Sequence, residues 1–176
     1  DYYCYDKPIL APADGYVEDI CDGLEDNEIG TVNTTNNWGN SIVIRHLPGV
    51  YSQLSHLKKN SFKVAKGSFV KQGEIIALCG NSGRSPEPHL HLQIQSSPVV
   101  GSRTIEYPVS YYNVRVNGTK QLQQFKVPVE GSIVSGFNTQ QSLYNAFNFE
   151  PESTLRCKSN NEKGIEIIEH WDSFTD

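Results

Sequence analysis

The length, composition and charge of this chain suit a globular β protein and exclude two broad functional classes. Its 176 residues are enough to bury a hydrophobic core, and 9 Tyr, 7 Phe, 14 Gly and 9 Pro favour strands separated by turns. The formal net charge of −5, with no basic stripe, argues against nucleic-acid binding. No apolar run reaches the roughly 18 residues that a transmembrane helix needs, so we expect no membrane span.

The first two thirds of the chain, residues 1–112, have the pattern of strands and turns and no helical period of useful length. A turn is predicted at Asp14 and Gly15, and the polar stretch 22–40 predicts a long surface loop. Gly67 and Gly73 mark a tight turn that leads into a buried strand. The strands predicted here cover residues 7–17 in two short pieces, 16–21, 41–46, 51–57, 75–76 and 89–95.

The pattern changes at residue 113, and we assign residues 113–176 to an appended, β-rich region of unknown function. Asn117 and Gly118 predict a hairpin turn. Residues 139–147 have apolar spacing typical of a short helix, and residues 164–171 resemble a strand. No motif in this region points to a particular chemistry.

The cysteines give a limited expectation. Cys4, Cys21, Cys79 and Cys157 form no C-x-x-C pair, which disfavours a metal knuckle built from cysteine alone. Cys79 follows an apolar run and is expected to be a buried thiol. The spacing leaves the oxidation state of the four open.

Residues 81–93 are the most informative segment of the chain. A loop rich in Gly, Ser and Pro runs into the alternating sequence HLHLQIQ. Side chains of a strand alternate between its two faces, so His89 and His91 are expected on one face. Leu90, Leu92 and Ile94 are expected on the other face, packed against a core.

His56 is a third candidate, because strands at 51–57 and 89–95 can be neighbours in one sheet. A catalytic zinc usually takes three protein ligands and binds a water, whose pKa it lowers to about 7. A nearby imidazole can then act as a general base or stabilise the developing oxyanion. The competing interpretations are two ordinary surface histidines at 89 and 91 and a half-buried structural histidine at 56.

The other two histidines are weaker candidates. His46 lies at a strand end before the sequence LPG, where a role facing a loop is the better interpretation. His170 stands beside Trp171 and has no partner in the sequence.

Taken in series, five stretches of the chain resemble the lysostaphin/LytM-type zinc endopeptidases of peptidase family M23. They lie in the family's order and at plausible spacing, and the resemblance, over residues 7–95, covers about half of the chain. The glycine turn alone is a weak signal, because biotinyl and lipoyl carrier barrels use it too, but no lysine here sits at a convincing hairpin tip. The five stretches are residues 7–17 (KPILAPADGYV), 38–46 (WGNSIVIRH), 51–57 (YSQLSHL), 64–76 (VAKGSFVKQGEII) and 80–91 (GNSGRSPEPHLH).

The resemblance implies a fold, a metal and a substrate. The fold would be mostly β, an antiparallel LytM-like sheet with a groove over its face and one zinc ion at the floor. His91 would be a zinc ligand, and His56 and His89 would be the catalytic imidazoles. The substrate would be the peptide cross-links of bacterial peptidoglycan, cut at amide bonds, which implies a location outside the cytoplasm.

One departure from the family pattern concerns the metal site. The family takes its other two zinc ligands from an earlier histidine and aspartate, and no histidine precedes His46 here. Asp1 lies near the expected place of that aspartate, but the residues around it do not match the usual setting. One imidazole cannot supply a three-ligand site.

Two explanations of this departure stay open. The chain starts at Asp1 without a methionine or a signal peptide, so we expect a shortened domain whose ligand-bearing segment lies upstream. The chain would then be part of a zinc-dependent endopeptidase. Otherwise it is a degenerate, non-catalytic relative that binds peptidoglycan or regulates another wall hydrolase.

Overall fold

The computed structural model describes residues 2–136, 154–160 and 166–172, and the chain divides into two compact units. The first unit is Asp1–Tyr107 and the second is Pro108–Asp176. The expected domain boundary after residue 112 falls inside strand β8, Val109–Val116. The helix predicted at 139–147 and the candidate ligand Asp1 lie outside the described residues.

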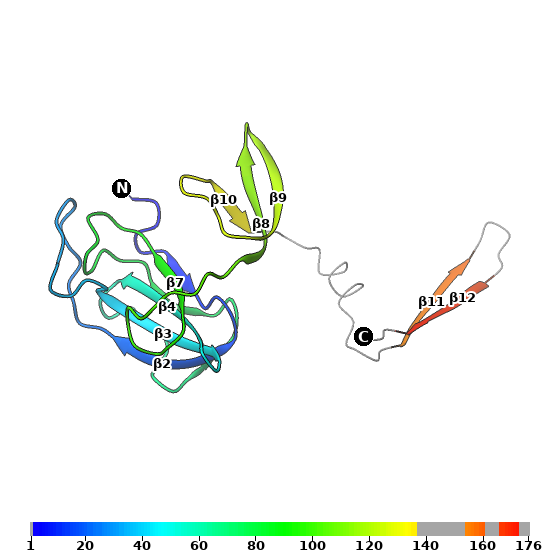
Figure 1. Cartoon of the computed structure of the whole chain (residues 1–176), viewed down its shortest axis with the longest axis horizontal. Coiled ribbons are helices and arrows are strands. Elements are labelled where there is room, and N and C mark those ends of the chain that lie inside the picture. The colour runs from blue at the N-terminus through cyan, green and yellow to red at the C-terminus, as the bar shows by residue number, and fades with distance from the viewer. Residues whose placement is uncertain (1, 137–153, 161–165, 173–176) are drawn as a thin grey trace. The chain divides into compact units, whose positions relative to one another are not determined.

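The first unit is built on a five-stranded antiparallel sheet in the order β5-β2-β3-β4-β7. Its four longer strands lie side by side in Figure 1. Two further strands, β1 (Pro8–Leu10) and β6 (Ile75–Leu78), form a small antiparallel sheet of their own. The strands of the larger sheet are β2 (Gly15–Cys21), β3 (Asn40–Leu47), β4 (Val50–Leu57), β5 (Phe69–Val70) and β7 (His91–Gln95).

The two faces of the larger sheet differ in character. One face carries Ile42, Ile44 and Leu54, which join residues of the small sheet in the hydrophobic core. The opposite face is buried but polar, with Gln53 and Ser55 on β4. Because side chains alternate along a strand, this single sheet supports an apolar core on one side and a polar site on the other.

The second unit contains a three-stranded sheet in the order β10-β8-β9 and a separate two-stranded ladder. The hairpin predicted at Asn117 and Gly118 is confirmed: it joins β8 to β9, and both residues have positive φ, as a tight hairpin turn requires. The remaining strands of this unit are β9 (Thr119–Lys126), β10 (Val134–Gly136), β11 (Thr154–Asn160) and β12 (Glu166–Asp172).

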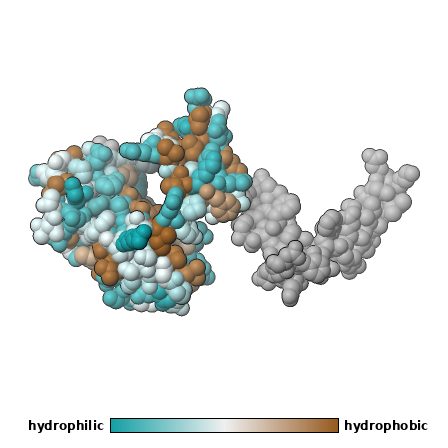
Figure 2. Space-filling model, in the orientation of Figure 1, coloured by the Kyte–Doolittle hydropathy of each residue, from teal (hydrophilic) through white to brown (hydrophobic). Residues whose placement is uncertain are grey.

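Strands and turns account for all the regular structure of the described residues, which confirms the predicted mostly β, antiparallel class. Among those residues, no helix is long and apolar enough to cross a membrane. On the visible face of the described parts, hydrophobic residues are scattered among hydrophilic ones (Figure 2). Cys79 is buried and carries a free thiol, as expected.

The packing expected for the leucines of the HLHLQIQ run is wrong. Leu90 and Leu92 are 38% and 50% exposed, and β7 begins at His91, so His89 lies in the loop before the strand. The reason is the position of β7 at the edge of the sheet. The hydrophobic core gathers around β2, β3 and β4 and takes no residue from β7.

Candidate active site

His56 owes its position to a β-bulge in strand β4. Leu54 and Leu57 pair with Ile42 and Asn40, so two residues of β4 lie opposite the single residue between them on β3. Such a bulge re-aims a side chain, and here the backbone of His56 takes a φ of +65°, which is rare for a residue with a side chain. Backbone strain of this kind is concentrated at functional sites.

The ring of His56 is buried and held in one orientation. His56 is only 4% exposed, and its Nδ1 lies 2.8 Å from the carbonyl oxygen of Ser82. A carbonyl oxygen only accepts hydrogen bonds, so Nδ1 donates its proton and Nε2 is left as an acceptor. Burial lowers the pKa of His56 below its usual value; the Ser82 hydrogen bond opposes this, and the electrostatic influence of His89 and His91 adds to the lowering.

The Ser82 carbonyl is fixed by a close approach of two chain segments. The backbone N–H of Asn40 donates to Ser82 Oγ at 2.9 Å, and this hydroxyl donates to the carbonyl of Leu57 at 2.8 Å. Gly39 and Gly83 let the two backbones touch, since a Cβ added at Gly83 would lie 2.4 Å from the Gly39 nitrogen. The imidazole orientation at His56 is therefore built into the loop that precedes the H-x-H motif.

His89 lies next to His56 and has the same tautomer. Its Nδ1 lies 2.8 Å from the carbonyl oxygen of Glu87 and 3.1 Å from Ser85 Oγ. The ring centroids of His56 and His89 are 4.7 Å apart. Two imidazoles therefore stand together, each with Nδ1 donating to a backbone carbonyl and Nε2 available as an acceptor.

His91 completes the group of three. Its ring centroid lies 6.0 Å from that of His56 and 5.1 Å from the indole of Trp38. His91 pairs with Ser55 across β4 and β7, which places it beside the bulge that carries His56. Its Nε2 lies 2.9 Å from Oε1 of Gln93. The structure thus brings His56, His89 and His91 together on the polar face of the sheet.

His46 lies apart from this group. Its Nδ1 contacts the carbonyl of Asp14 at 2.7 Å and its Nε2 contacts Ser52 Oγ at 2.8 Å, so it ties a turn to β4. The side chain of His170 lies outside the described residues.

The sequence interpretation gave no role to several residues that hold the histidines. These are Ser82 and Ser85 in the loop, Trp38 beside His91, and Gln93 in the strand. Gln93 could have been found from the alternation, because it shares a face with His91. The Ser82 carbonyl leaves no signal in the sequence, since any residue supplies one.

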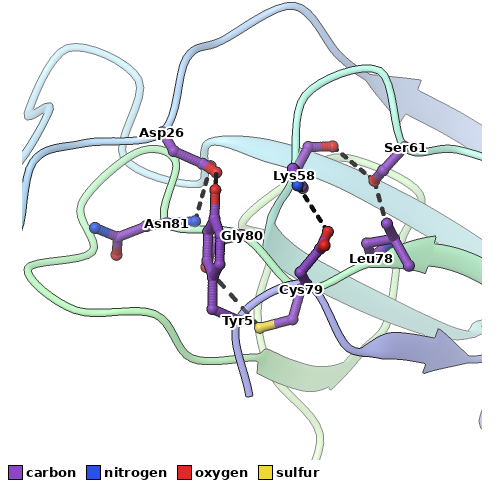
Figure 3. Close-up of polar contacts among 9 residues, drawn as sticks. Tyr5, Asp26, Lys58, Ser61, Leu78, Cys79, Gly80 and Asn81 are labelled. Atoms are coloured by element: carbon purple, nitrogen blue, oxygen red, sulfur yellow. Dashed lines mark hydrogen bonds and ion pairs between the residues drawn. The ribbon is translucent and has the colours of Figure 1, made fainter. Parts of the chain in front are cut away.

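A hollow of about 490 Å³ lies in the same unit, and none of the three site histidines lines it. It is lined by Tyr2, Tyr5, Asp26 and Pro88, among others, and Pro88 precedes His89 in the chain. Tyr5 donates its hydroxyl to Asp26 at 2.9 Å (Figure 3). That hydrogen bond, with burial and the charge of Asp26, raises the pKa of Tyr5 above its usual value and keeps the phenol protonated.

The donor chemistry of the site suits zinc only in part. Neutral imidazole is a common zinc ligand. Within the described residues, however, no group of three or more His, Cys, Asp or Glu side chains is arranged to hold a metal. Among the described residues, His91 is one candidate ligand.

Comparison with known proteins assigns the family. The model of "Peptidase family M23" matches residues 2–103, more than half of the chain. This chain therefore belongs to peptidase family M23, and the resemblance noted in the sequence is confirmed.

Individual relatives match only in part. A DD-carboxypeptidase/endopeptidase, Mpg, of Neisseria meningitidis is 42% identical over 64 residues, covering 35% of this chain and 14% of the relative. The peptidoglycan DD-endopeptidase ShyC of Vibrio cholerae is 33% identical over 102 residues, covering 57% of this chain and 20% of the relative. The crystal structure of a zinc-containing peptidase from Vibrio cholerae is 31% identical, covers 53% of this chain and 25% of that one, and gives a TM-score of 0.40. This chain thus spans a fifth or less of the two enzymes.

Proposed function

We propose that this chain carries the catalytic imidazoles of a zinc-dependent endopeptidase, which hydrolyses amide bonds in the peptide cross-links of bacterial peptidoglycan. The observation that carries the proposal is the pair formed by His56 and His89, 4.7 Å apart and oriented alike by backbone carbonyls. Membership of peptidase family M23 supports the reaction class, and relatives named as peptidoglycan endopeptidases support the substrate class.

His56 and His89 would manage the proton in this reaction. Each keeps Nδ1–H on a carbonyl, so each offers Nε2 to a water or to the scissile group. One Nε2 can take a proton from the attacking water, and the other, once protonated, can donate to the developing oxyanion or the leaving amine. The lowered pKa of His56 keeps its ring neutral, and therefore able to accept a proton, at neutral pH.

His91 would be the metal ligand of this chain. Zinc, when bound, supplies a polarised carbonyl or an acidified water, which is the chemistry that peptide hydrolysis needs. A complete site requires further ligands beyond those described here.

The hollow lined by Pro88, the residue before His89 in the chain, would take part of the substrate peptide. Tyr2 and Tyr5 offer aromatic faces, and Asp26 is held in place by Tyr5 and by the backbone N–H of Asn81 at 2.8 Å. Because peptidoglycan lies outside the cytoplasm, we place the protein in the periplasm, the cell envelope or the medium.

The test is cleavage of purified cross-linked muropeptides, followed by mass spectrometry of the products. It uses this chain and a form extended upstream of Asp1. We expect cleavage by the extended form, and its loss on chelation and on His89→Ala. The matched control is His46→Ala, because His46 contacts Asp14 and Ser52 rather than the site.

Two outcomes would contradict the proposal. Cleavage that persists in His89→Ala, or in the presence of a chelator, would remove the proposed roles of the imidazole and the metal. Binding of peptidoglycan without cleavage by either form would instead indicate a non-catalytic relative.

A further inference from the structure

We propose that Gln93 is a positioning residue for His91: it holds the proton of that ring on Nε2, and its own direction is dictated by backbone carbonyls of the loop 97–102. The inference rests on the proposed function only in so far as His91 belongs to the active site. The series of hydrogen bonds from the loop 97–102 through Gln95 and Gln93 to His91, which we call the relay, is itself a property of the fold.

The relay begins at Gln95, whose amide can point in only one direction. Its Nε2 lies 2.8 Å from the carbonyl oxygen of Ser97 and 3.0 Å from that of Val99. Carbonyl oxygens only accept hydrogen bonds, so the NH₂ group of Gln95 must face them. Gln95 is fully buried, and a reversed amide would bring three acceptor oxygens together away from water.

The direction of Gln95 fixes that of Gln93. Oε1 of Gln95 is left facing Gln93, and Nε2 of Gln93 donates to it at 2.7 Å. The same NH₂ group also lies 3.4 Å from the carbonyl oxygen of Ser102, again an acceptor. Gln93 therefore turns its own Oε1 toward His91 and can only accept a hydrogen bond there.

The last link sets the tautomer of His91. Since Gln93 Oε1 accepts, His91 Nε2 must carry the proton that is donated over 2.9 Å. Nδ1 is then the unprotonated nitrogen of a neutral ring. The other three histidines of the described residues have the opposite arrangement, with Nδ1 donating to the carbonyls of Asp14, Ser82 and Glu87.

The loop that anchors the relay is itself fastened to the site. The backbone N–H of Gly101 donates to Gln53 Oε1 at 2.6 Å, and Gln53 lies opposite Gln93 across the two strands. Gly101 also packs so closely on Trp38 that an added Cβ would lie 2.3 Å from the indole nitrogen. Trp38 in turn contacts His91, so ring position and ring tautomer are both set from this loop.

The test is a long-range ¹H–¹⁵N correlation spectrum of the full chain labelled at histidine. It is recorded in chelator at about pH 8, above the usual imidazole pKa of about 6.5. We expect His91 to be protonated on Nε2, in contrast to His46, His56 and His89. In Gln93→Met, which keeps the length of the side chain and removes the acceptor, we expect His91 to show both tautomers. Gln124→Met, the same change at an exposed position of β9, should leave the spectrum as in the wild type.

Two spectra would overturn the inference: a wild-type His91 protonated on Nδ1, or a Gln93→Met spectrum identical to that of the wild type. The first test uses only the wild type, so it is valid even if the variant fails to fold. For Gln93→Met, unchanged His46 signals show that the variant has folded. If the extended chain hydrolyses peptidoglycan, Gln93→Met should lower kcat by about 10- to 100-fold, the usual effect of losing a partner of a metal-binding residue. A wild type that shows the Nε2 tautomer and no hydrolysis would refute the proposed function and leave the relay standing.

Discussion

Replacement of Gly83 by alanine is expected to cost far more stability than the same change at Gly73. Both glycines have nearly the same left-handed backbone, with φ of +80° and +82°. An alanine in this conformation costs roughly 1–2 kcal/mol at either position. The two sites differ in their surroundings, which makes Gly73 the matched control within the same unit.

The extra cost at Gly83 comes from contacts with backbone atoms. Its added Cβ would lie 2.4 Å from the nitrogen of Gly39, 2.7 Å from the Cα of Gly39 and 2.8 Å from the carbonyl oxygen of Asn36, whereas nothing lies within 4 Å at Gly73. Overpacking of this kind typically costs about 1–3 kcal/mol. We therefore expect Gly83→Ala to lose about 2–5 kcal/mol in total, and Gly73→Ala only about 1–2 kcal/mol.

Urea unfolding followed by circular dichroism measures both variants. With a slope of about 1–3 kcal/mol per molar urea, the two midpoints should differ by roughly 1 M. Gly83→Ala should also displace the Ser82 carbonyl from His56, and so lower hydrolysis by the extended chain. Equal destabilisation of the two variants would refute the close packing of the loop against Gly39.

Three further predictions concern the buried interior of the first unit. Asn40→Ala removes a side chain that hydrogen-bonds the backbone of Leu24 and the carbonyl of Leu57, so the free energy of unfolding should fall by about 2–4 kcal/mol and the Leu24 amide should exchange faster with deuterium. Ser41→Ala removes a buried hydroxyl without a partner among the described residues, and should leave thermal stability unchanged or raise it by up to about 1 kcal/mol; a clear loss would indicate a partner. Burial, aided by the neighbouring Cys4, raises the pKa of Cys79 to about 12, whereas the thiol of the unfolded chain has a pKa of about 8.5. The stability that this shift contributes is therefore fully present below about pH 8.5. Above that pH, the free energy of unfolding falls by about 1.4 kcal/mol per pH unit. Denaturant unfolding measured between about pH 8 and pH 11 should therefore show a free energy of unfolding that falls more steeply with pH for the wild type than for Cys79→Ala.

The strands could be predicted from the sequence because their signals are local. The strands predicted at 41–46 and 51–57 lie within β3 and β4, and the Asn117–Gly118 turn joins β8 to β9. The loop between β2 and β3 also falls where the polar stretch predicts it. Periodicity and turn chemistry depend on neighbours in the chain, which one sequence displays in full.

The sequence predicts which histidines form the candidate site but not how their rings are oriented. The H-x-H motif and His56 were found, but the bulge that turns His56 inward depends on pairing with β3 and is invisible in the sequence of β4 alone. The packing of the leucines in the HLHLQIQ run is not predictable from alternation, which shows which residues share a face but not that β7 lies at the sheet edge and contributes nothing to the core. The hydrogen bonds that orient His56 and His89 come from backbone carbonyls, which every residue possesses.

The loop 97–102 has a practical consequence for shortening this protein. Beyond that loop, Gln95 bridges Thr104, and the N–H of Ile105 donates to the carbonyl of Ile94 at 2.8 Å. A truncated version that stops soon after the H-x-H strand would retain all three site imidazoles and yet lose the scaffold that aims one of them. An engineered minimal form should therefore run at least through Ile105.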